Sequence, residues 1–262
     1  MADFSNARFD LSGKVAIVTG AGGRGNSIGR AYSVALANAG ASVVVADINA
    51  DGAKAVADEI TRAGGKAISV QVDITDEASA RGMAEAAAAA FGGVDILVNN
   101  AALMVEISGR RLTEIDRAEF DKFIAVNTWG ALNCTQAVKS SMIARGGGAI
   151  VNQVTAGAFP AGSLYGVTKL ALAAITTSLA LELGSKNIRV NAIAPGMTKS
   201  DAGLMLTPDE SPVVQSVVAR CPIQARDTPD ALCGALLLLV SDAGRWMTGQ
   251  TLHVDGGWVM RT

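Results

Sequence analysis

The sequence is poor in the residues that build metal centres and disulfide frameworks. It contains one histidine, His253, and three cysteines, Cys134, Cys221 and Cys233. The cysteines are widely spaced and form no Cys-x-x-Cys pair, which argues against a disulfide framework and against a thiolate metal site. A single histidine without cysteine or carboxylate neighbours at ligand spacing argues against catalytic zinc. We therefore expect no metal and a cytoplasmic, reducing location.

Charge of one sign and long apolar runs are also scarce. Lys and Arg number 22 against 24 Asp and Glu, and the net charge of −2 provides no basic field for a nucleic acid backbone. The apolar stretches 84–91 and 231–240 are shorter than the roughly 20 residues that a membrane-spanning helix needs. The N-terminus shows no basic region followed by an apolar run, as a secretory signal would. We expect neither nucleic acid nor a membrane as a partner.

The composition instead favours a buried parallel sheet. Half of the 262 residues are hydrophobic, 29 are glycine, and only 4% are aromatic. This balance suits a sheet covered by alanine-rich helices, and the length is that of one α/β domain.

Strand-like and helical patterns alternate along the chain. The expected strands are 15–19, 42–46, 67–72, 96–98, 149–154 and 189–194, with a last one near 250–255. The expected helices are 28–39, 50–63, 77–91, 117–144 and 165–183. The alternation predicts a single-domain Rossmann-type α/β fold, a doubly wound parallel sheet of about seven strands flanked by helices. Residues 197–228, which are rich in proline, are expected to leave the sheet and form a substrate lid.

A glycine-rich turn follows the first strand. Gly20, Gly22, Gly23, Gly25 and Gly29 occur in Thr19-Gly-Ala-Gly-Gly-Arg-Gly-Asn-Ser-Ile-Gly29, directly before a helix. Such a turn lets the backbone approach a pyrophosphate and directs the helix N-terminal amides at it. The position after a first strand predicts a dinucleotide site rather than a merely flexible loop.

An acidic residue ends the second strand. A carboxylate at Asp47 can accept hydrogen bonds from both ribose hydroxyls of adenosine and would repel a 2′-phosphate, which favours NAD over NADP. Arg24 is an argument for NADP instead, because its guanidinium could pair with a 2′-phosphate. Asp73 and Ile74 follow the third strand, and 99–102 follow the fourth, where they can meet adenine and its ribose. Capping of a helix is the other interpretation of Asp73.

Tyr165 and Lys169 are spaced i, i+4 at the start of an expected helix, so both project from one face. A nearby ammonium stabilises a phenolate, and this should lower the tyrosine pKa toward the range where it exchanges a proton with an alcohol.

Taken together, these motifs resemble the short-chain dehydrogenase/reductase family over residues 10–260. The matching residues are Thr19-Gly20 with Gly29, Asp47, Asn99-Asn-Ala101, Asn127, Tyr165-x-x-x-Lys169, Asn191-Ala-Ile-Ala-Pro-Gly196 and Thr248-Gly-Gln with Asp255-Gly-Gly257.

The resemblance implies a catalytic tetrad of Asn, Ser, Tyr and Lys. Asn127, Tyr165 and Lys169 match three members, and Thr155 stands at the serine position. By this likeness Asn127 holds the water that links Lys169 to solvent, and Lys169 also binds the nicotinamide ribose. The expected cofactor-binding residues are Gly20, Gly25, Asn26, Ser27, Ile28, Asp47, Asp73, Ile74, Asn99, Ala101, Tyr165, Lys169, Pro195, Gly196, Thr198 and Ser200.

Two departures from the family pattern bear on function. Residues 21–26 make the glycine turn longer than usual, and Ser27 replaces a glycine, so phosphate contacts there differ. Thr155 keeps the hydroxyl of the missing serine, but its methyl group and stiffer χ1 could misplace that hydroxyl. Ser163 is the alternative donor.

The resulting prediction is an oxidoreductase that transfers a hydride between NAD(H) and a secondary alcohol or ketone, with a small apolar alicyclic or aromatic body. The expected pocket walls are Met104, Val105, Phe159, Met197, Leu204 and Met205, whose other interpretation is core packing. Two alternatives remain, a 3-oxoacyl-thioester reductase acting on an acyl carrier protein and a non-catalytic dinucleotide sensor. The resemblance further implies a homotetramer, or a homodimer, assembled through 118–144, 165–183 and 246–259.

Overall fold

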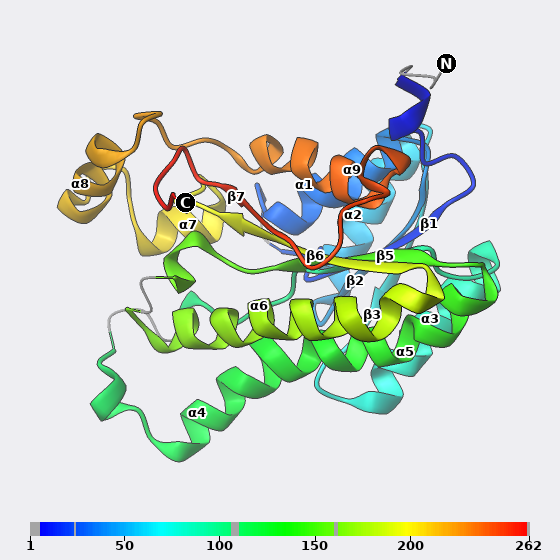
Figure 1. The fold of residues 1–262 in the computed structure, drawn as a ribbon, viewed down its shortest axis with the longest axis horizontal. Coiled ribbons are helices and arrows are strands. Elements are labelled where there is room, and N and C mark those ends of the chain that lie inside the picture. The colour runs from blue at the N-terminus through cyan, green and yellow to red at the C-terminus, as the bar shows by residue number, and fades with distance from the viewer. Residues whose placement is uncertain (1–5, 24, 106–109, 160–161, 261–262) are drawn as a thin grey trace.

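The sheet that the sequence predicts is present. The computed structural model describes residues 6–23, 25–105, 110–159 and 162–260. Its seven parallel strands lie in the order β3-β2-β1-β4-β5-β6-β7 (Figure 1). They are β1 (Val15–Thr19), β2 (Ser42–Asp47), β3 (Lys66–Gln71), β4 (Ile96–Asn99), β5 (Gly148–Gln153), β6 (Ile188–Pro195) and β7 (Thr251–Val254). The expected ends of each strand agree with the observed ends to within one residue. The predicted fold class is confirmed.

Helices cover both faces of the sheet (Figure 1). One face carries α1 (Ile28–Asn38), α2 (Ala50–Arg62) and α9 (Cys233–Val240). The other carries α3 (Glu77–Phe91), α4 (Arg117–Ile124), α5 (Gly130–Ala144) and α6 (Leu164–Leu183). In β2, Val43 and Val45 pack into the first of these layers, whereas Val44 packs into the second. Burial on both sides explains why the strands are continuous apolar runs rather than alternating ones.

The single helix expected over 117–144 is interrupted. A π-helical turn, Ala125–Trp129, separates α4 from α5 and contains Asn127. Such turns appear mostly inside α-helices and often at functional sites. The periodicity of apolar and polar residues does not reveal a change of helical pitch over a single turn, so the sequence could not show this interruption.

By length and composition alone, the stretch Leu164–Lys186, which contains α6, passes as a candidate membrane span. The expectation that no apolar stretch reaches that length is therefore wrong for this helix. However, 44% of its most apolar 18 residues are buried inside the domain, and the core helix of a compact domain has the same composition. Buried Lys169 and Thr176 face the interior from it.

The segment 197–228 leaves the sheet between β6 and α9. It contains two short helices, α7 (Asp201–Leu206) and α8 (Pro212–Arg220), which lie beyond the carboxyl ends of the central strands (Figure 1). Pro212 starts α8, where its missing N–H costs nothing.

Candidate active site

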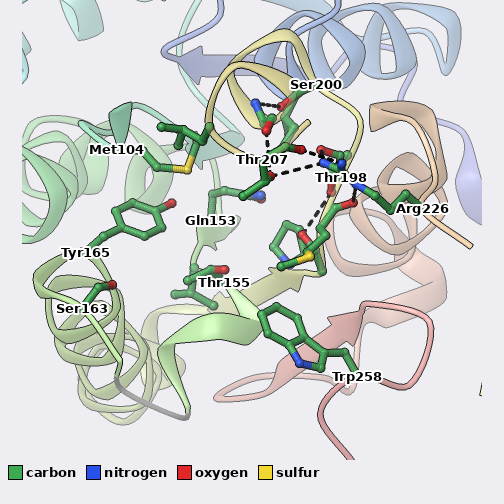
Figure 2. A pocket seen from close by; sticks show the side chains of 17 residues that line it. Met104, Gln153, Thr155, Ser163, Tyr165, Thr198, Ser200, Thr207, Arg226 and Trp258 are labelled. Carbon is green, nitrogen blue, oxygen red and sulfur yellow. Dashed lines mark hydrogen bonds between the residues drawn. The ribbon is translucent and has the colours of Figure 1, made fainter. Parts of the chain in front are cut away.

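A cavity of about 340 Å³ lies at the carboxyl ends of β5 and β6 (Figure 2). Figure 2 shows Tyr165, Thr155 and Ser163 on one wall and Thr198 and Ser200 on the segment opposite. The full lining consists of Ile28, Met104, Gln153, Val154, Thr155, Ser163, Tyr165, Pro195, Gly196, Met197, Thr198, Ser200, Gly203, Leu206, Thr207, Arg226 and Trp258. The cavity therefore brings together residues predicted for catalysis and residues predicted for the cofactor, at the edge where such sheets bind ligands.

The glycine turn is built for close backbone approach. Gly20 has φ +65°, and a Cβ there would lie 2.5 Å from the Cα of Ala101. A Cβ on Gly29 would lie 2.4 Å from the Gly20 carbonyl oxygen. Ser27 caps the first turn of α1 by accepting a hydrogen bond from the backbone N–H of Arg30. This cradle and the helix N-terminus fit the pyrophosphate of a dinucleotide.

Asn100 holds this turn against β4. Its Nδ2 donates to the backbone oxygens of Thr19 and Gly20, both at 3.0 Å. Residues 99–102 were expected to meet adenine and its ribose, with Asn99 and Ala101 as the cofactor-binding residues. The side chain of Asn99 instead points into the protein interior, where its Nδ2 donates to Asn152 Oδ1 at 2.9 Å. Only its backbone lies near the edge.

Asp47 lies where a ribose-binding carboxylate should. Its Oδ2 accepts from the backbone N–H of Gly22 at 2.8 Å, and its Oδ1 accepts from that of Asn49 at 2.9 Å. Each carboxylate oxygen has a further lone pair, so two hydroxyl donors can still be accepted. Arg24, which was weighed against this interpretation, lies outside the described residues.

The residues after β3 have local partners. The exposed Asp73 accepts hydrogen bonds at Oδ1 from the backbone and hydroxyl of Thr75, so the turn interpretation of this residue describes its contacts in the structure. Ile74 is buried against Gly130, whose hypothetical Cβ would lie 2.5 Å from its Cδ1. Both residues remain at the carboxyl edge of the sheet, next to β2.

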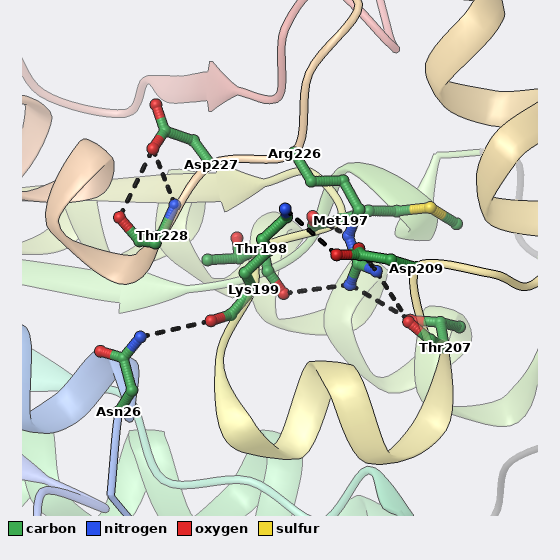
Figure 3. Close-up of polar contacts among 9 residues, drawn as sticks. All are labelled: Asn26, Met197, Thr198, Lys199, Thr207, Asp209, Arg226, Asp227 and Thr228. Carbon is green, nitrogen blue, oxygen red and sulfur yellow. Dashed lines mark hydrogen bonds and ion pairs between the residues drawn. The ribbon is translucent and has the colours of Figure 1, made fainter.

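Gly25 and Asn26 face the 197–228 segment rather than open space. The backbone of Asn26 donates to Asp201 Oδ2 at 3.2 Å, and the backbone N–H of Asp201 donates back to the Asn26 oxygen at 3.2 Å. The Asn26 Nδ2 also donates to the Lys199 oxygen at 3.4 Å (Figure 3). The lengthened glycine turn is thus joined to the start of α7 by reciprocal hydrogen bonds.

Tyr165 and Lys169 lie one turn apart on α6, and burial governs their ionisation. The Lys169 Nζ donates to the Gln153 backbone oxygen at 2.8 Å and lies 5.8 Å from the Tyr165 ring centroid. Burial lowers the pKa of Lys169 to about 7 and raises the pKa of Tyr165. The expected lowering of the tyrosine pKa is wrong for the protein alone, because desolvation disfavours the phenolate.

The Asn127 side chain is fully engaged. Its Oδ1 accepts from the Leu103 N–H at 2.7 Å, and its Nδ2 donates to the Leu103 oxygen at 2.9 Å and to Thr168 Oγ1 at 3.1 Å. A water held by this residue would therefore have to bind its backbone carbonyl in the π-helical turn. The side chain fixes the loop after β4 to α6.

Thr155 and Ser163 both present hydroxyls to the cavity. Thr155 Oγ1 accepts from the Gly157 N–H at 3.3 Å, and Ser163 Oγ accepts from the Gly166 N–H at 3.1 Å as the cap of α6. Both acceptor bonds leave the hydroxyl proton available for a substrate oxygen. The geometry thus provides two donors flanking Tyr165 rather than one.

Of the six expected wall residues, Met104 and Met197 line the cavity. Val105 and Met205 are exposed, Phe159 packs on His253 with ring centroids 4.8 Å apart, and Leu204 is half-buried outside the lining. Sequence reasoning missed Gln153, Leu206, Thr207, Arg226 and Trp258. Leu206, Thr207 and Arg226 lie within the segment expected to form a lid, but no local motif marks any of the five as part of the cavity wall.

Arg226 fastens the two ends of the 197–228 segment together (Figure 3). Its side chain is only 3% exposed. It donates to the backbone oxygen of Met197 at 2.8 Å, to that of Thr207 at 2.7 Å, and to Asp209 Oδ1 at 2.9 Å. The guanidinium is occupied by the protein itself, so Arg226 shapes the cavity wall instead of offering free donors to a ligand.

Residues 23–259 match the family model described as Enoyl-(Acyl carrier protein) reductase. An uncharacterized oxidoreductase of Mycobacterium tuberculosis is 48% identical, over 95% of this chain and 98% of the relative.

Solved structures agree with this match. A 7 alpha-hydroxysteroid dehydrogenase complexed with NADH and 7-oxo glycochenodeoxycholic acid has a TM-score of 0.88 and 36% identity, covering 99% of both chains. A putative NAD(P) dependent gluconate 5-dehydrogenase from Beutenbergia cavernae with bound NADP has a TM-score of 0.87 and 35% identity, covering 96% of this chain and 98% of the other. The chain is therefore an oxidoreductase that belongs to the short-chain dehydrogenase/reductase family.

Proposed function

We propose that this enzyme transfers a hydride between NAD(H) and a secondary alcohol or ketone with a small, apolar, alicyclic or aromatic body. The observation that carries the proposal is the convergence of the Tyr165 phenol and the Thr155 hydroxyl on one cavity, with buried Lys169 directly behind them. The same cavity reaches Ile28 and Pro195 at the dinucleotide edge.

When bound, NAD supplies a hydride acceptor. In the proposed mechanism the Tyr165 phenolate accepts the hydroxyl proton of the alcohol during oxidation, and the Tyr165 phenol returns it to the ketone oxygen during reduction. Thr155 donates a hydrogen bond to that oxygen in both directions. Lys169, held by the Gln153 carbonyl, provides positive charge beside the phenol when it is protonated. That charge opposes the burial that raises the pKa of Tyr165. Protons then pass toward solvent along the backbone near Asn127.

A preference for NAD over NADP rests on Asp47. Its carboxylate stays beside the glycine turn, bonded to the Gly22 N–H, where a 2′-phosphate would meet like charge. The next residue, Ile48, is 66% exposed and offers no cation to such a phosphate. Related structures hold NADH in one case and NADP in another, so family membership does not decide between the two cofactors. The preference rests on the residues of this chain.

An apolar substrate is supported by the cavity wall. Met104, Met197, Leu206 and Trp258 supply soft or aromatic surface, and the guanidinium of Arg226 is taken up by protein oxygens. A steroid occupies the related 7 alpha-hydroxysteroid dehydrogenase, which supports an alicyclic alcohol.

The 197–228 segment would serve as the substrate lid, since α7 and Thr207 border the cavity and Arg226 anchors both of its ends. We also propose a cytoplasmic homotetramer, or homodimer, without a nucleic acid or membrane partner. Exposed apolar residues on the surfaces expected to assemble support the oligomer alone, namely Trp129, Leu170, Leu181 and Trp246.

The two alternatives make different demands. An acyl-carrier thioester reductase would favour NADP and free cations at the entrance, which Asp47 and the occupied Arg226 disfavour. A non-catalytic sensor would not need hydroxyls beside Tyr165, yet Thr155 and Ser163 both line the cavity.

The test is NAD-dependent turnover of cyclic and aromatic secondary alcohols. We expect Tyr165→Phe to abolish turnover while NADH still binds, because only the hydroxyl is lost. Thr155→Val should lower kcat more than its matched control Ser163→Ala if Thr155 replaces the family serine. Equal rates in wild type and Tyr165→Phe would remove Tyr165 from the mechanism, and tight NADH binding without any turnover would favour the sensor.

A further inference from the structure

The side chain of Gln153 has no role in the mechanism above, although it lies at the centre of the site. Gln153 is the last residue of β5, is 5% exposed and lines the cavity between the catalytic wall and the segment opposite (Figure 2). Its backbone oxygen holds Lys169. A buried polar side chain at this position needs hydrogen-bond partners for both ends of its amide.

Tyr32 fixes the orientation of the amide. The Tyr32 hydroxyl is fully buried on α1 and donates to Gln153 Oε1 at 2.8 Å. Gln153 is the only hydrogen-bond partner of that hydroxyl within the described part of the chain. Because the hydroxyl proton needs an acceptor, the amide oxygen must face Tyr32 and the amide nitrogen must face away from it.

No hydrogen bond from the Gln153 Nε2 to a protein acceptor is found among the described residues. The side chain borders the cavity, so water or a molecule bound in the cavity can accept this hydrogen bond. An amide N–H donates and never accepts, which restricts that partner to an oxygen or nitrogen with a free lone pair.

The position of Tyr32 indicates which ligand this is. Tyr32 lies one turn along α1 from Ile28, the residue that follows the glycine turn, and its bond draws the amide toward α1. Ile28, Pro195 and Gly196 surround the cavity on this cofactor side, whereas Thr155 and Tyr165 belong to the substrate side.

We propose that Gln153 donates a hydrogen bond from Nε2 to an acceptor oxygen on the nicotinamide mononucleotide half of the dinucleotide, and that Tyr32 is the positioning residue that orients it. This inference rests on the proposed function and extends it to the floor of the nicotinamide site. It gives the Tyr32 and Gln153 pair, which joins α1 to β5, a part in cofactor affinity as well as in packing.

The experiment compares two ligands by calorimetry: NADH, which contains the nicotinamide mononucleotide half, and 5′-AMP, which lacks it. Gln153→Met keeps the length of the side chain and removes the donor. We expect about five- to tenfold weaker NADH binding, the size of one lost hydrogen bond, and unchanged 5′-AMP binding. Tyr32→Phe should weaken NADH binding about two- to fivefold by releasing the amide.

The double variant provides the matched control. Adding Tyr32→Phe to Gln153→Met should weaken NADH binding no further, because Tyr32 acts on the cofactor only through the amide. Additive losses, or equal losses for NADH and 5′-AMP, would mean that the pair supports the fold alone and would overturn the proposal. So would unchanged NADH binding with a raised KM for the alcohol, which would assign the amide to the substrate. Failure of wild-type protein to bind either ligand would instead overturn the proposed function itself, and this inference with it.

Discussion

Replacing the buried Lys169 by methionine should make the protein more stable while removing its chemistry. Lys169 is fully buried, and burial lowers its pKa from 10.5 to about 7. A fall of that size corresponds to about 5 kcal/mol between the two protonation states. The unfolded chain therefore binds one more proton than the folded chain between pH 7 and 10.5. Stability contributed by this group rises with pH through that window and is lowest below pH 7.

The magnitude can be measured as a difference between wild type and Lys169→Met. Other titrating groups are common to both proteins and cancel. We expect the stability advantage of Lys169→Met to shrink by about 2 kcal/mol when the pH rises from 7 to 9, because the wild type loses the cost of burying an ammonium. The lost bond to the Gln153 oxygen lowers the advantage by about 1 kcal/mol at every pH.

Urea unfolding at pH 7, 8 and 9, without added dinucleotide, measures this difference directly. Activity assays on the same samples should show no turnover by Lys169→Met at any of the three values. A stability difference that stays constant over the range would refute the reasoning, since it would mean that Lys169 titrates in the folded protein as it does in water.

Further expectations concern the cofactor edge and the cavity wall. Asp47→Ser should lower the ratio of the NADPH dissociation constant to the NADH dissociation constant by about tenfold. Removing one negative charge beside the 2′-phosphate stabilises bound NADPH by about 1 kcal/mol or more, and fluorescence titration measures both constants. Gly22→Ala should destabilise the fold by about 1–3 kcal/mol in urea, since its Cβ would lie 2.4 Å from the Ala53 nitrogen. Arg226→Met should raise the KM for alcohol about fivefold or more and weaken NADH binding less, since it removes the donor to the backbone oxygens of Met197 and Thr207. An unchanged KM in steady-state kinetics would mean that the segment keeps its position without Arg226.

The fold was predictable because its signals are local. The apolar runs of the strands and the 3.6-residue periodicity of the helices mark each element, and a parallel sheet buried on both faces leaves continuous apolar strands. The glycine turn and the Tyr165 and Lys169 pair were found for the same reason, since each occupies one short stretch of sequence.

Long-range contacts account for what the sequence did not reveal. Arg226 reaches the oxygens of Met197 and Thr207 from the far end of a segment, and Trp258 joins the cavity wall from the C-terminal turn. The direction of a side chain was also hidden. Asn99 and Asn100 are adjacent and chemically identical, yet Asn99 points into the protein interior and Asn100 holds the glycine turn. Only the strand's pleat decides between them.

The reciprocal hydrogen bonds between Asn26 and Asp201 bear on the order in which ligands enter. They join the turn that would receive the pyrophosphate to the first residue of α7, which borders the alcohol side of the cavity. A dinucleotide that engages the turn therefore also sets the position of α7 before an alcohol arrives. We expect a compulsory sequence in which the dinucleotide binds first and leaves last, and a product-inhibition pattern in which NADH competes with NAD+ while the ketone does not.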